Sequence, residues 1–159
     1  MLSRSDYEHL IYTLPTRFPS IRFSTLVLAP PGLDIARLTG LVALGDDIVL
    51  CVYELLDFQQ GIIEAYRYEV SECHPPFGVN PLPEPEEYCS VSYVDKRTLY
   101  WYDSWPHPNA PSLAATHPHH KHVLPDIKRN RVPAVELSFS RPNLPCLIRE
   151  VERDLLGQA

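Results

Sequence analysis

The sequence has no apolar run of about 20 residues, the length that a membrane-spanning helix requires. Its opening, MLSRSDYEHL, also lacks the apolar core of an export signal. Internal repeats and low-complexity tracts are absent, apart from a bias towards proline, which occurs 17 times. These absences predict a soluble, cytoplasmic protein with no membrane partner.

Cysteine occurs four times, but no two cysteines have the CxxC spacing that redox and zinc motifs use. Because no export signal precedes them, we expect Cys51, Cys73, Cys89 and Cys146 to be reduced thiols in small, buried, apolar positions. Cys73 and Cys89 bracket a proline-rich stretch. Their positions in the sequence alone do not show whether they approach each other.

The chain of 159 residues is predicted to form one domain over residues 1–159, long enough to bury a core without disulfides. Its net charge of −6 argues against a surface coated with basic residues for binding nucleic acid. Residues 104–141 nevertheless hold five basic and two acidic residues, a net +3 that leaves −9 for the rest. A local basic patch of this kind attracts a polyanion to one face only.

Helices are predicted at both ends of the chain. Residues 5–8, Ser-Asp-Tyr-Glu, have the spacing of a capping box, and Pro15 is expected to help end the helix that follows. Near the other end, Ser140 or Asn143 can cap a helix, and Pro145 suits its first turn. The apolar positions at helical spacing are Tyr7, Leu10, Ile11 and Leu14 in the first helix and Leu144, Leu147, Ile148, Val151 and Leu155 in the second.

Runs rich in Val, Ile, Leu and Tyr lie between the helices and predict strands. Connections as short as residues 45–47 and 59–61 cannot carry parallel crossovers, so the sheet is predicted to be antiparallel. Arg67 and Glu69 alternate with apolar residues and are expected on the other face of their strand. The predicted strands are Phe23–Ala29, Ile35–Leu44, Ile48–Leu56, Ile62–Val70, Tyr88–Val94 and Thr98–Asp103.

Two proline-rich stretches interrupt this pattern. Residues 71–87 contain five prolines and are interpreted as an exposed loop inserted between two strands. Residues 95–97 are interpreted as the turn of the final hairpin, and residues 104–133 as a histidine-rich loop without a helix or strand period. The predicted fold class is α+β: a curved antiparallel sheet with flanking N- and C-terminal helices and the histidine loop across one end or face.

Five of the seven histidines lie in residues 98–122, TLYWYDSWPHPNAPSLAATHPHHKH, beside an aromatic strand. Imidazole titrates near neutral pH and suits proton transfer, metal ligation or phosphate pairing, so this cluster is a candidate site. Alternation along the strand places Trp101 and Asp103 on one face and Tyr100 and Tyr102 on the other. The candidate catalytic residues are His107, His117, His119, His120, Lys121, His122 and Asp103.

One chemistry that fits these residues is metal-free cleavage of RNA. It needs a base to take the 2′-hydroxyl proton, an acid to protonate the leaving oxygen and a cation to stabilise the charge on phosphorus. Two histidines can supply both proton transfers, and Lys121 or Arg131 can supply the cation. Aromatic rings can stack on unpaired bases. The candidate substrate-binding residues are Trp101, Tyr102, Lys128, Arg129 and Arg131.

Two other interpretations stay open. The imidazoles at 117, 119, 120 and 122, with an oxygen of Asp103, are a suitable ligand set for zinc or manganese, although their spacing matches no established zinc signature. Such a metal would be labile or catalytic, or the chain would be a non-enzymatic protein whose His-rich loop binds a divalent transition metal or a protein partner. Alternatively, individual histidines only stiffen the loop by hydrogen-bonding backbone carbonyls. The metal-free enzymatic interpretation needs no cofactor, and its rival is an enzyme with a catalytic zinc or manganese centre.

The segment from Tyr100 to His122, YWYDSWPHPNAPSLAATHPHHKH, resembles the signature of the TumE family, the toxin components of two-gene toxin–antitoxin loci. The order of a short helix, strands, an aromatic strand ending in Tyr-Asp, the HPHHKH box and a terminal apolar helix is also similar. The resemblance implies a toxin that acts on RNA and an antitoxin partner with a helix-turn-helix domain. It carries over to Tyr102, Asp103, His107, His117, His119, His120, Lys121 and His122.

The chain departs from the family pattern at two places. The family often shows Pro-His-His-Pro where this chain has Pro106-His107-Pro108, so a role for a second histidine there is absent. Residues 71–87 are longer than the corresponding stretch of typical members, which suits either a partner contact or a loop without a role. The sequence leaves open a homodimer, the RNA target and the cleavage chemistry.

Overall fold

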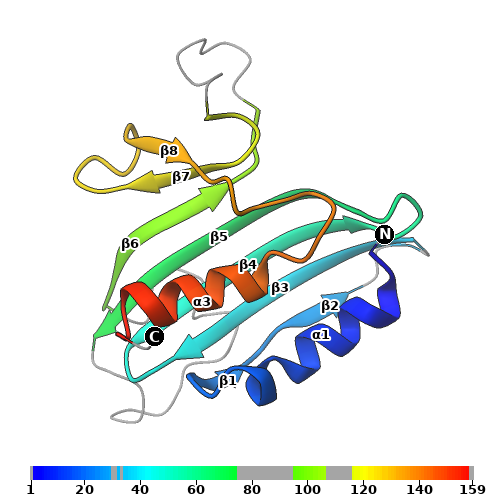
Figure 1. Cartoon of the computed structure of the whole chain (residues 1–159), viewed down its shortest axis with the longest axis horizontal. Coiled ribbons are helices and arrows are strands. Elements are labelled where there is room, and N and C mark those ends of the chain that lie inside the picture. Colours follow the sequence, from blue (N-terminus) through cyan, green and yellow to red (C-terminus); the bar gives the residue numbers. More distant parts are fainter. Residues whose placement is uncertain (1, 30–31, 33, 75–94, 107–115, 158–159) are drawn as a thin grey trace.

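The computed structural model describes residues 2–29, 32, 34–74, 95–106 and 116–157. The elements are α1 (Arg4–Arg17), β1 (Ile21–Ser24), β2 (Val27–Ala29), β3 (Ile35–Leu44), β4 (Ile48–Asp57), β5 (Ile62–His74), β6 (Asp95–Asp103), β7 (His120–Val123), β8 (Arg131–Pro133) and α3 (Leu144–Asp154). In these ranges the strands form one antiparallel sheet in the order β1-β3-β4-β5-β6-β7-β8, with β2 also paired to β3 (Figure 1). The predicted α+β fold with helices near both ends is confirmed. No described helix is long and apolar enough to cross a membrane.

The first helix buries the predicted apolar stripe, but its ends differ from the prediction. Ser3 is the N-cap, because its hydroxyl accepts a hydrogen bond from the Asp6 backbone N–H at 3.2 Å, whereas Ser5 lies inside the helix. Pro15 also lies inside the helix, in its last turn. The described helix ends at Arg17, so the proline does not stop it.

The C-terminal helix follows the prediction more closely. Asn143 is the N-cap and Pro145 lies in the first turn. The Asn143 side chain does not cap its own helix; it accepts from the Ser138 N–H at 2.9 Å and donates to the Tyr68 hydroxyl at 3.0 Å. Asn143 therefore joins α3 to the centre of the sheet. The buried side chains of the helix are Leu144, Leu147, Ile148 and Val151.

Both helices pack on the same face of the sheet. The Tyr7 hydroxyl of α1 donates to Glu54 of β4, and Tyr68 of β5 donates to the same carboxylate. Tyr68 also accepts the hydrogen bond from Asn143 at the start of α3. Because side chains alternate along a strand, the neighbouring residues of each strand lie on the opposite face. That opposite face, turned away from α1 and α3, is called the far face below.

The predicted single strand Phe23–Ala29 is wrong, because the chain forms two short strands, β1 and β2, on the same edge of β3. Leu26, between them, is buried, and the Thr25 N–H donates to the Leu41 carbonyl at 2.9 Å. Gly40 of β3 faces this break with a φ of +131°, a backbone conformation that only glycine adopts readily. The break between β1 and β2 thus directs the Leu26 side chain into the core.

The predicted loop at 71–87 is wrong over residues 71–74, because β5 continues to His74. Ser71 and Cys73 are small and fully buried, and they pair with Thr98 and Lys96 of β6. Residues 95–97, predicted as a turn, therefore belong to β6. The rest of the loop, the predicted strand 88–94 and Cys89 lie outside the described residues.

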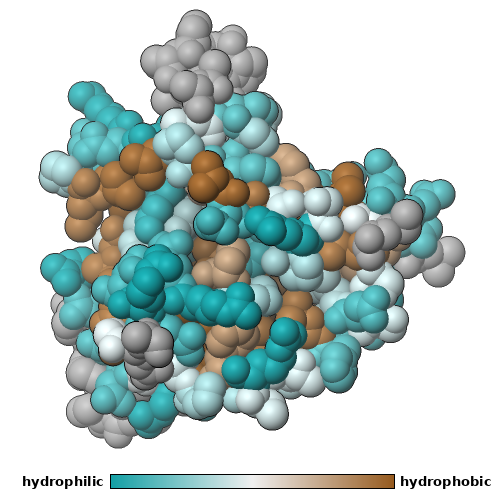
Figure 2. Space-filling view, viewed as in Figure 1, coloured by the Kyte–Doolittle hydropathy of each residue, from teal (hydrophilic) through white to brown (hydrophobic). Residues whose placement is uncertain are grey.

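The predicted loop at 104–133 also contains structure. β7 pairs with β6 and β8 pairs with β7, which extends the sheet by a hairpin. The strands are four and three residues long, too short for a period to stand out in the sequence. Figure 2 shows apolar side chains at the surface around this hairpin, where Leu124 is 53% and Val132 41% exposed.

Candidate functional site

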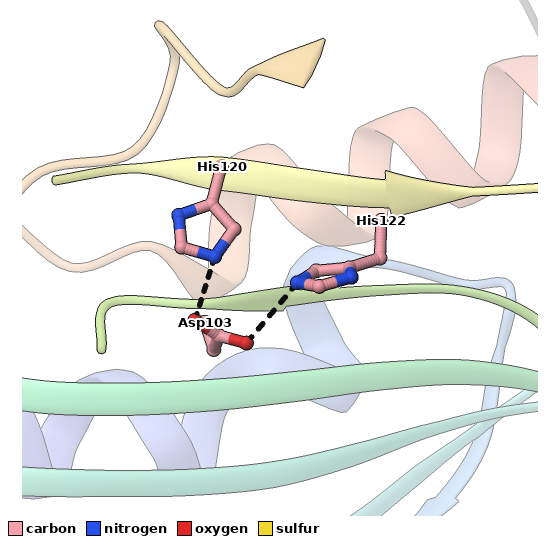
Figure 3. A group of neighbouring side chains, drawn as sticks. All are labelled: Asp103, His120 and His122. Atoms are coloured by element: carbon pink, nitrogen blue, oxygen red, sulfur yellow. Dashed lines mark ion pairs between the residues drawn. The ribbon is translucent and has the colours of Figure 1, made fainter. Parts of the chain in front are cut away.

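Three chemically active side chains meet on the far face at the junction of β6 and β7. Asp103 is the last residue of β6, and it lies opposite His120 in the strand pairing. His122 is two residues further along β7, so its imidazole projects from the same face as that of His120. Both rings point to the Asp103 carboxylate (Figure 3). His120 Nε2 lies 2.8 Å from Asp103 Oδ1, and His122 Nε2 lies 3.3 Å from Asp103 Oδ2.

This cluster is held in place by its neighbours on the sheet. The Trp101 ring stacks on the His122 ring, with 4.5 Å between their centroids, and the Arg67 guanidinium lies 5.8 Å from the Trp101 centroid on the β5 side. Arg67 is also the strand partner of Asp103. The two histidines are almost fully buried, and the Asp103 side chain is 13% exposed. The carboxylate is therefore the most accessible of the three groups.

The hydrogen bond of His122 to the backbone shows that its Nδ1 atom carries a proton. Its Nδ1 lies 2.9 Å from the Ile127 carbonyl, which can only accept, so Nδ1 carries the proton and donates it. Burial lowers the pKa of His122, and the Arg131 charge lowers it further, against the Ile127 hydrogen bond and the Asp103 charge, which raise it. Nε2 of the same ring faces Asp103 Oδ2, so in the neutral form of the ring its lone pair points to the carboxylate.

The basic residues proposed for substrate binding lie on the adjoining hairpin. Arg131 of β8 is the strand partner of His122, which places it on the far face beside the cluster. Lys128 and Arg129 lie in the connection between β7 and β8, and both are exposed. Arg129 has only a loose ion pair with Asp126, at 3.7 Å. Lys128, Arg129 and Arg131 thus place three positive charges within nine residues of His122 along the chain.

Lys121 and Tyr102 lie on the opposite face from the cluster. They pair with each other across β6 and β7, and both bind Glu150 of α3. The Lys121 ammonium also lies 3.8 Å from the centre of the Tyr100 ring. Tyr102 is buried, and burial together with the Glu150 contact raises its pKa. The structure therefore does not bring these two candidates to Asp103, His120 and His122.

The remaining histidine candidates are also placed away from the cluster. His119 Nδ1 lies 2.7 Å from the Tyr66 hydroxyl, and its ring packs on Phe139, on the face that α3 covers. Burial, then the neighbouring His117, lower the pKa of His119. His117 is exposed just before β7, and His107 lies outside the described residues.

Sequence reasoning missed two parts of this site. It placed Arg67 on the face of its strand opposite the apolar residues, but nothing in the sequence showed that the strand pairs with β6 beside Asp103. It also missed the Ile127 carbonyl, because a backbone acceptor carries no signal of residue type. The alternation of His120 and His122 about Lys121 was the one available signal for the cluster.

The arrangement has a clear chemical character. One ligand atom each from Asp103, His120 and His122 can be chosen so that all three lie within 4.8 Å of one another. Two imidazole nitrogens and a carboxylate oxygen form a common ligand set for divalent transition metals. By contrast, two imidazoles acting as independent base and acid would face a substrate from separate positions. Here both Nε2 atoms aim at one carboxylate.

Comparison with known proteins agrees with the resemblance in the sequence. The family described as toxin TumE matches residues 37–155, which run from within β3 to the end of α3 and include the whole Asp103, His120 and His122 cluster. No curated protein and no solved structure matches the chain. A family match over this much of the sequence is decisive, and the chain belongs to the TumE family of toxins of toxin–antitoxin systems.

Proposed function

We propose that this toxin is a ribonuclease whose reactive groups are Asp103, His120 and His122. The observation that carries the proposal is the convergence of both imidazoles on the Asp103 carboxylate, at 2.8 and 3.3 Å. Such a buried group of titratable side chains is costly to maintain and is typical of a functional site. Its position inside the family match supports a role in toxicity.

RNA is the proposed substrate because of what surrounds the cluster. Arg131 lies beside His122, and Lys128 and Arg129 are exposed on the same hairpin, so a phosphate chain that approaches Asp103 meets positive charge. Trp105, two residues beyond Asp103, is 59% exposed and offers a ring for an unpaired base. Trp101 is contacted by His122 and Arg67, so its proposed role is to hold the site as well as to border the substrate.

The proposed partner is an antitoxin encoded beside the toxin, with a helix-turn-helix DNA-binding domain. Membership of a toxin family supports a neutralising partner, because a toxin gene persists only where its product can be restrained. The proposed site of action is the cytoplasm, where the RNA substrates are made.

The experiment compares growth and RNA integrity after induction of the wild-type chain and of Asp103→Asn and His122→Ala. His9→Ala and Asp46→Asn are matched controls, because both residues are exposed, His9 on α1 and Asp46 in the turn between β3 and β4. We expect the two cluster variants to lose growth inhibition and RNA cleavage at unchanged protein levels, and the controls to keep both. Purified proteins are then tested on a synthetic RNA and on the same RNA with 2′-deoxy positions.

Two outcomes would overturn the proposal. Full toxicity of Asp103→Asn and His122→Ala would show that the cluster is not the reactive site. If the two variants lose toxicity but the wild-type protein cleaves no RNA, in cells or in solution, the toxin acts by binding instead. Cleavage of RNA that is indifferent to the 2′-deoxy substitution would assign a different nucleophile but keep the ribonuclease.

A further inference from the structure

The Asp103, His120 and His122 cluster has the features of a metal site. His122 Nδ1 donates to the Ile127 carbonyl, which leaves the Nε2 of the neutral ring as an acceptor. This Nε2 lies 3.3 Å from Asp103 Oδ2, and a carboxylate oxygen is also an acceptor. Among the described residues, Nε2 of His122 has no hydrogen-bond partner although it is buried. A cation placed between His122 Nε2 and Asp103 Oδ2 would bind both atoms, and His120 Nε2 also faces this carboxylate.

The spacing of these atoms is close to what shared ligation requires. Ligands bound tetrahedrally to zinc at 2.0 to 2.2 Å lie about 3.3 to 3.6 Å from one another. His122 Nε2 lies 3.3 Å from Asp103 Oδ2, whereas His120 Nε2 lies 2.8 Å from the other oxygen, Oδ1, so ligation through one oxygen requires the carboxylate to turn. All three ligand atoms fit within 4.8 Å. Small shifts of side chains that already point together would complete the site.

The surroundings of the cluster also match those of known metal sites. A histidine that binds a metal almost always donates its other N–H to a carbonyl or a carboxylate, which fixes the tautomer and the ring orientation. Ile127 supplies that carbonyl for His122. The stacked Trp101 ring restrains the same imidazole from the side. The site is thus ordered before any ion enters.

We propose that Asp103, His120 and His122 bind one divalent transition metal ion of the zinc class, through one carboxylate oxygen and the two Nε2 atoms. Three protein ligands leave at least one coordination position open, as in catalytic zinc sites and unlike structural ones. In the proposed ribonuclease this position would accept a water molecule or a phosphate oxygen of the RNA. That role rests on the proposed function, whereas binding of the metal does not.

The test measures metal binding by the full chain without RNA. Protein stripped with chelator is titrated with Co²⁺, followed by the visible absorption of the bound ion, and Zn²⁺ is then added as a competitor. We expect one ion per chain. Asp103→Asn, His120→Ala and His122→Ala should each weaken binding by more than the roughly 10- to 100-fold that loss of an outer hydrogen-bond partner causes. His117→Ala and His9→Ala are matched controls and should bind as the wild type does.

Two results would overturn the proposal. If no ion binds to the wild-type chain, the cluster is not a metal site. If binding is lost in His117→Ala but kept in Asp103→Asn, the ion is held by the linear histidine box and not by the far face. A ribonuclease assay does not enter either decision, so failure of this inference and failure of the proposed function remain distinguishable.

A second measurement covers the case in which a cluster variant fails to fold. Nitrogen-15 spectra of the wild-type imidazoles, recorded with and without Zn²⁺, report on each ring nitrogen separately. We expect the metal to shift Nε2 of His120 and His122, while Nδ1 of His122 keeps its proton. Unchanged Nε2 signals on these two rings in the presence of excess Zn²⁺ would contradict the assignment.

Discussion

The Tyr102 hydroxyl of β6 lies 2.6 Å from both carboxylate oxygens of Glu150 in α3. Lys121 of β7 reaches the same carboxylate from the adjoining strand. This contact joins the C-terminal helix to the two strands that carry Asp103, His120 and His122 on their other side. Contacts on the helix face of the sheet thereby restrain the two strands that carry the cluster on the far face.

Glu150→Ala is predicted to destabilise the fold without removing the cluster. The substitution leaves the buried Tyr102 hydroxyl and the Lys121 ammonium without their acceptor, which costs about 1–3 kcal/mol for an unsatisfied buried group. Chemical denaturation of both proteins measures the difference. Asp154→Ala, on the exposed end of the same helix, is the control and should change the free energy of unfolding by less than about 0.5 kcal/mol.

Lys121→Met separates the two roles that Lys121 can have. If Lys121 only binds Glu150 and the Tyr100 ring, the variant loses stability but retains growth inhibition when its level matches the wild type. Loss of RNA cleavage at unchanged stability and level would instead place Lys121 in the chemistry. The unfolding transition and the cleavage assay on the same preparation decide between these outcomes.

Stability is predicted to fall as the pH rises from about 4.5 to 7, because of Glu54. Burial raises the pKa of its carboxyl from 4.5 to about 7, although the hydroxyls of Tyr68 and Tyr7 favour the charged form. The folded state therefore binds a proton more tightly than the unfolded state does. This stabilisation is complete below the pKa of Glu54 in the unfolded state. It is lost as the pH rises through the pKa in the folded state, and the total loss is about 3 kcal/mol.

Denaturation at pH 5 and at pH 8 tests this dependence. Glu54→Gln keeps the shape of the side chain and removes the titration, so its stability should change much less between the two pH values. Asp46→Asn, at an exposed position, should follow the wild type. A wild-type stability that is equal at both pH values, or higher at pH 8, would contradict the buried acid.

The sequence predicted those parts of the fold whose patterns are long. Tyr7 to Leu14 and Leu144 to Val151 repeat at helical spacing and are buried as expected, and β3 has the predicted bounds. The hairpin of β7 and β8 was missed because strands of four and three residues show no period. Recognition of β7 as a strand would have separated His120 and His122 from Lys121 by alternation.

The candidate site was predictable only in its composition. The sequence placed Asp103, His120 and His122 among the candidates, but the pairing of Asp103 with His120 depends on the register between β6 and β7. Register is set by how strands meet in three dimensions and leaves no local signal of residue type. For the same reason the far-face neighbour Arg67, 36 positions from Asp103, could not be assigned to the site.

Gly40→Ala is predicted to destabilise the fold strongly. A Cβ at this position would lie 2.5 Å from the Thr25 carbonyl oxygen, and the φ of +131° is unfavourable for any other residue. We expect the free energy of unfolding to fall by about 1–3 kcal/mol or more, because this is the cost of a strained backbone position. Gly32→Ala is the matched control, because its Cβ meets nothing within 4 Å and its φ is outside the strained range. Equal midpoints of thermal unfolding for the two variants would contradict the packing of Thr25 on Gly40.

The β7–β8 connection is predicted to contribute to RNA affinity through phosphates. Lys128 and Arg129 are exposed there, next to the strand that carries His122, and each phosphate contact releases counterions. Binding of a single-stranded RNA to an inactive Asp103→Asn chain should weaken as salt increases. Lys128→Ala/Arg129→Ala should reduce the slope of log affinity against log salt by about 1.4, or 0.7 for each contact. Arg17→Ala/Arg149→Ala removes the same charge from α1 and α3 and should leave the slope unchanged. Equal slopes for the two double variants would show that the charge of the whole protein, and not this hairpin, attracts the RNA.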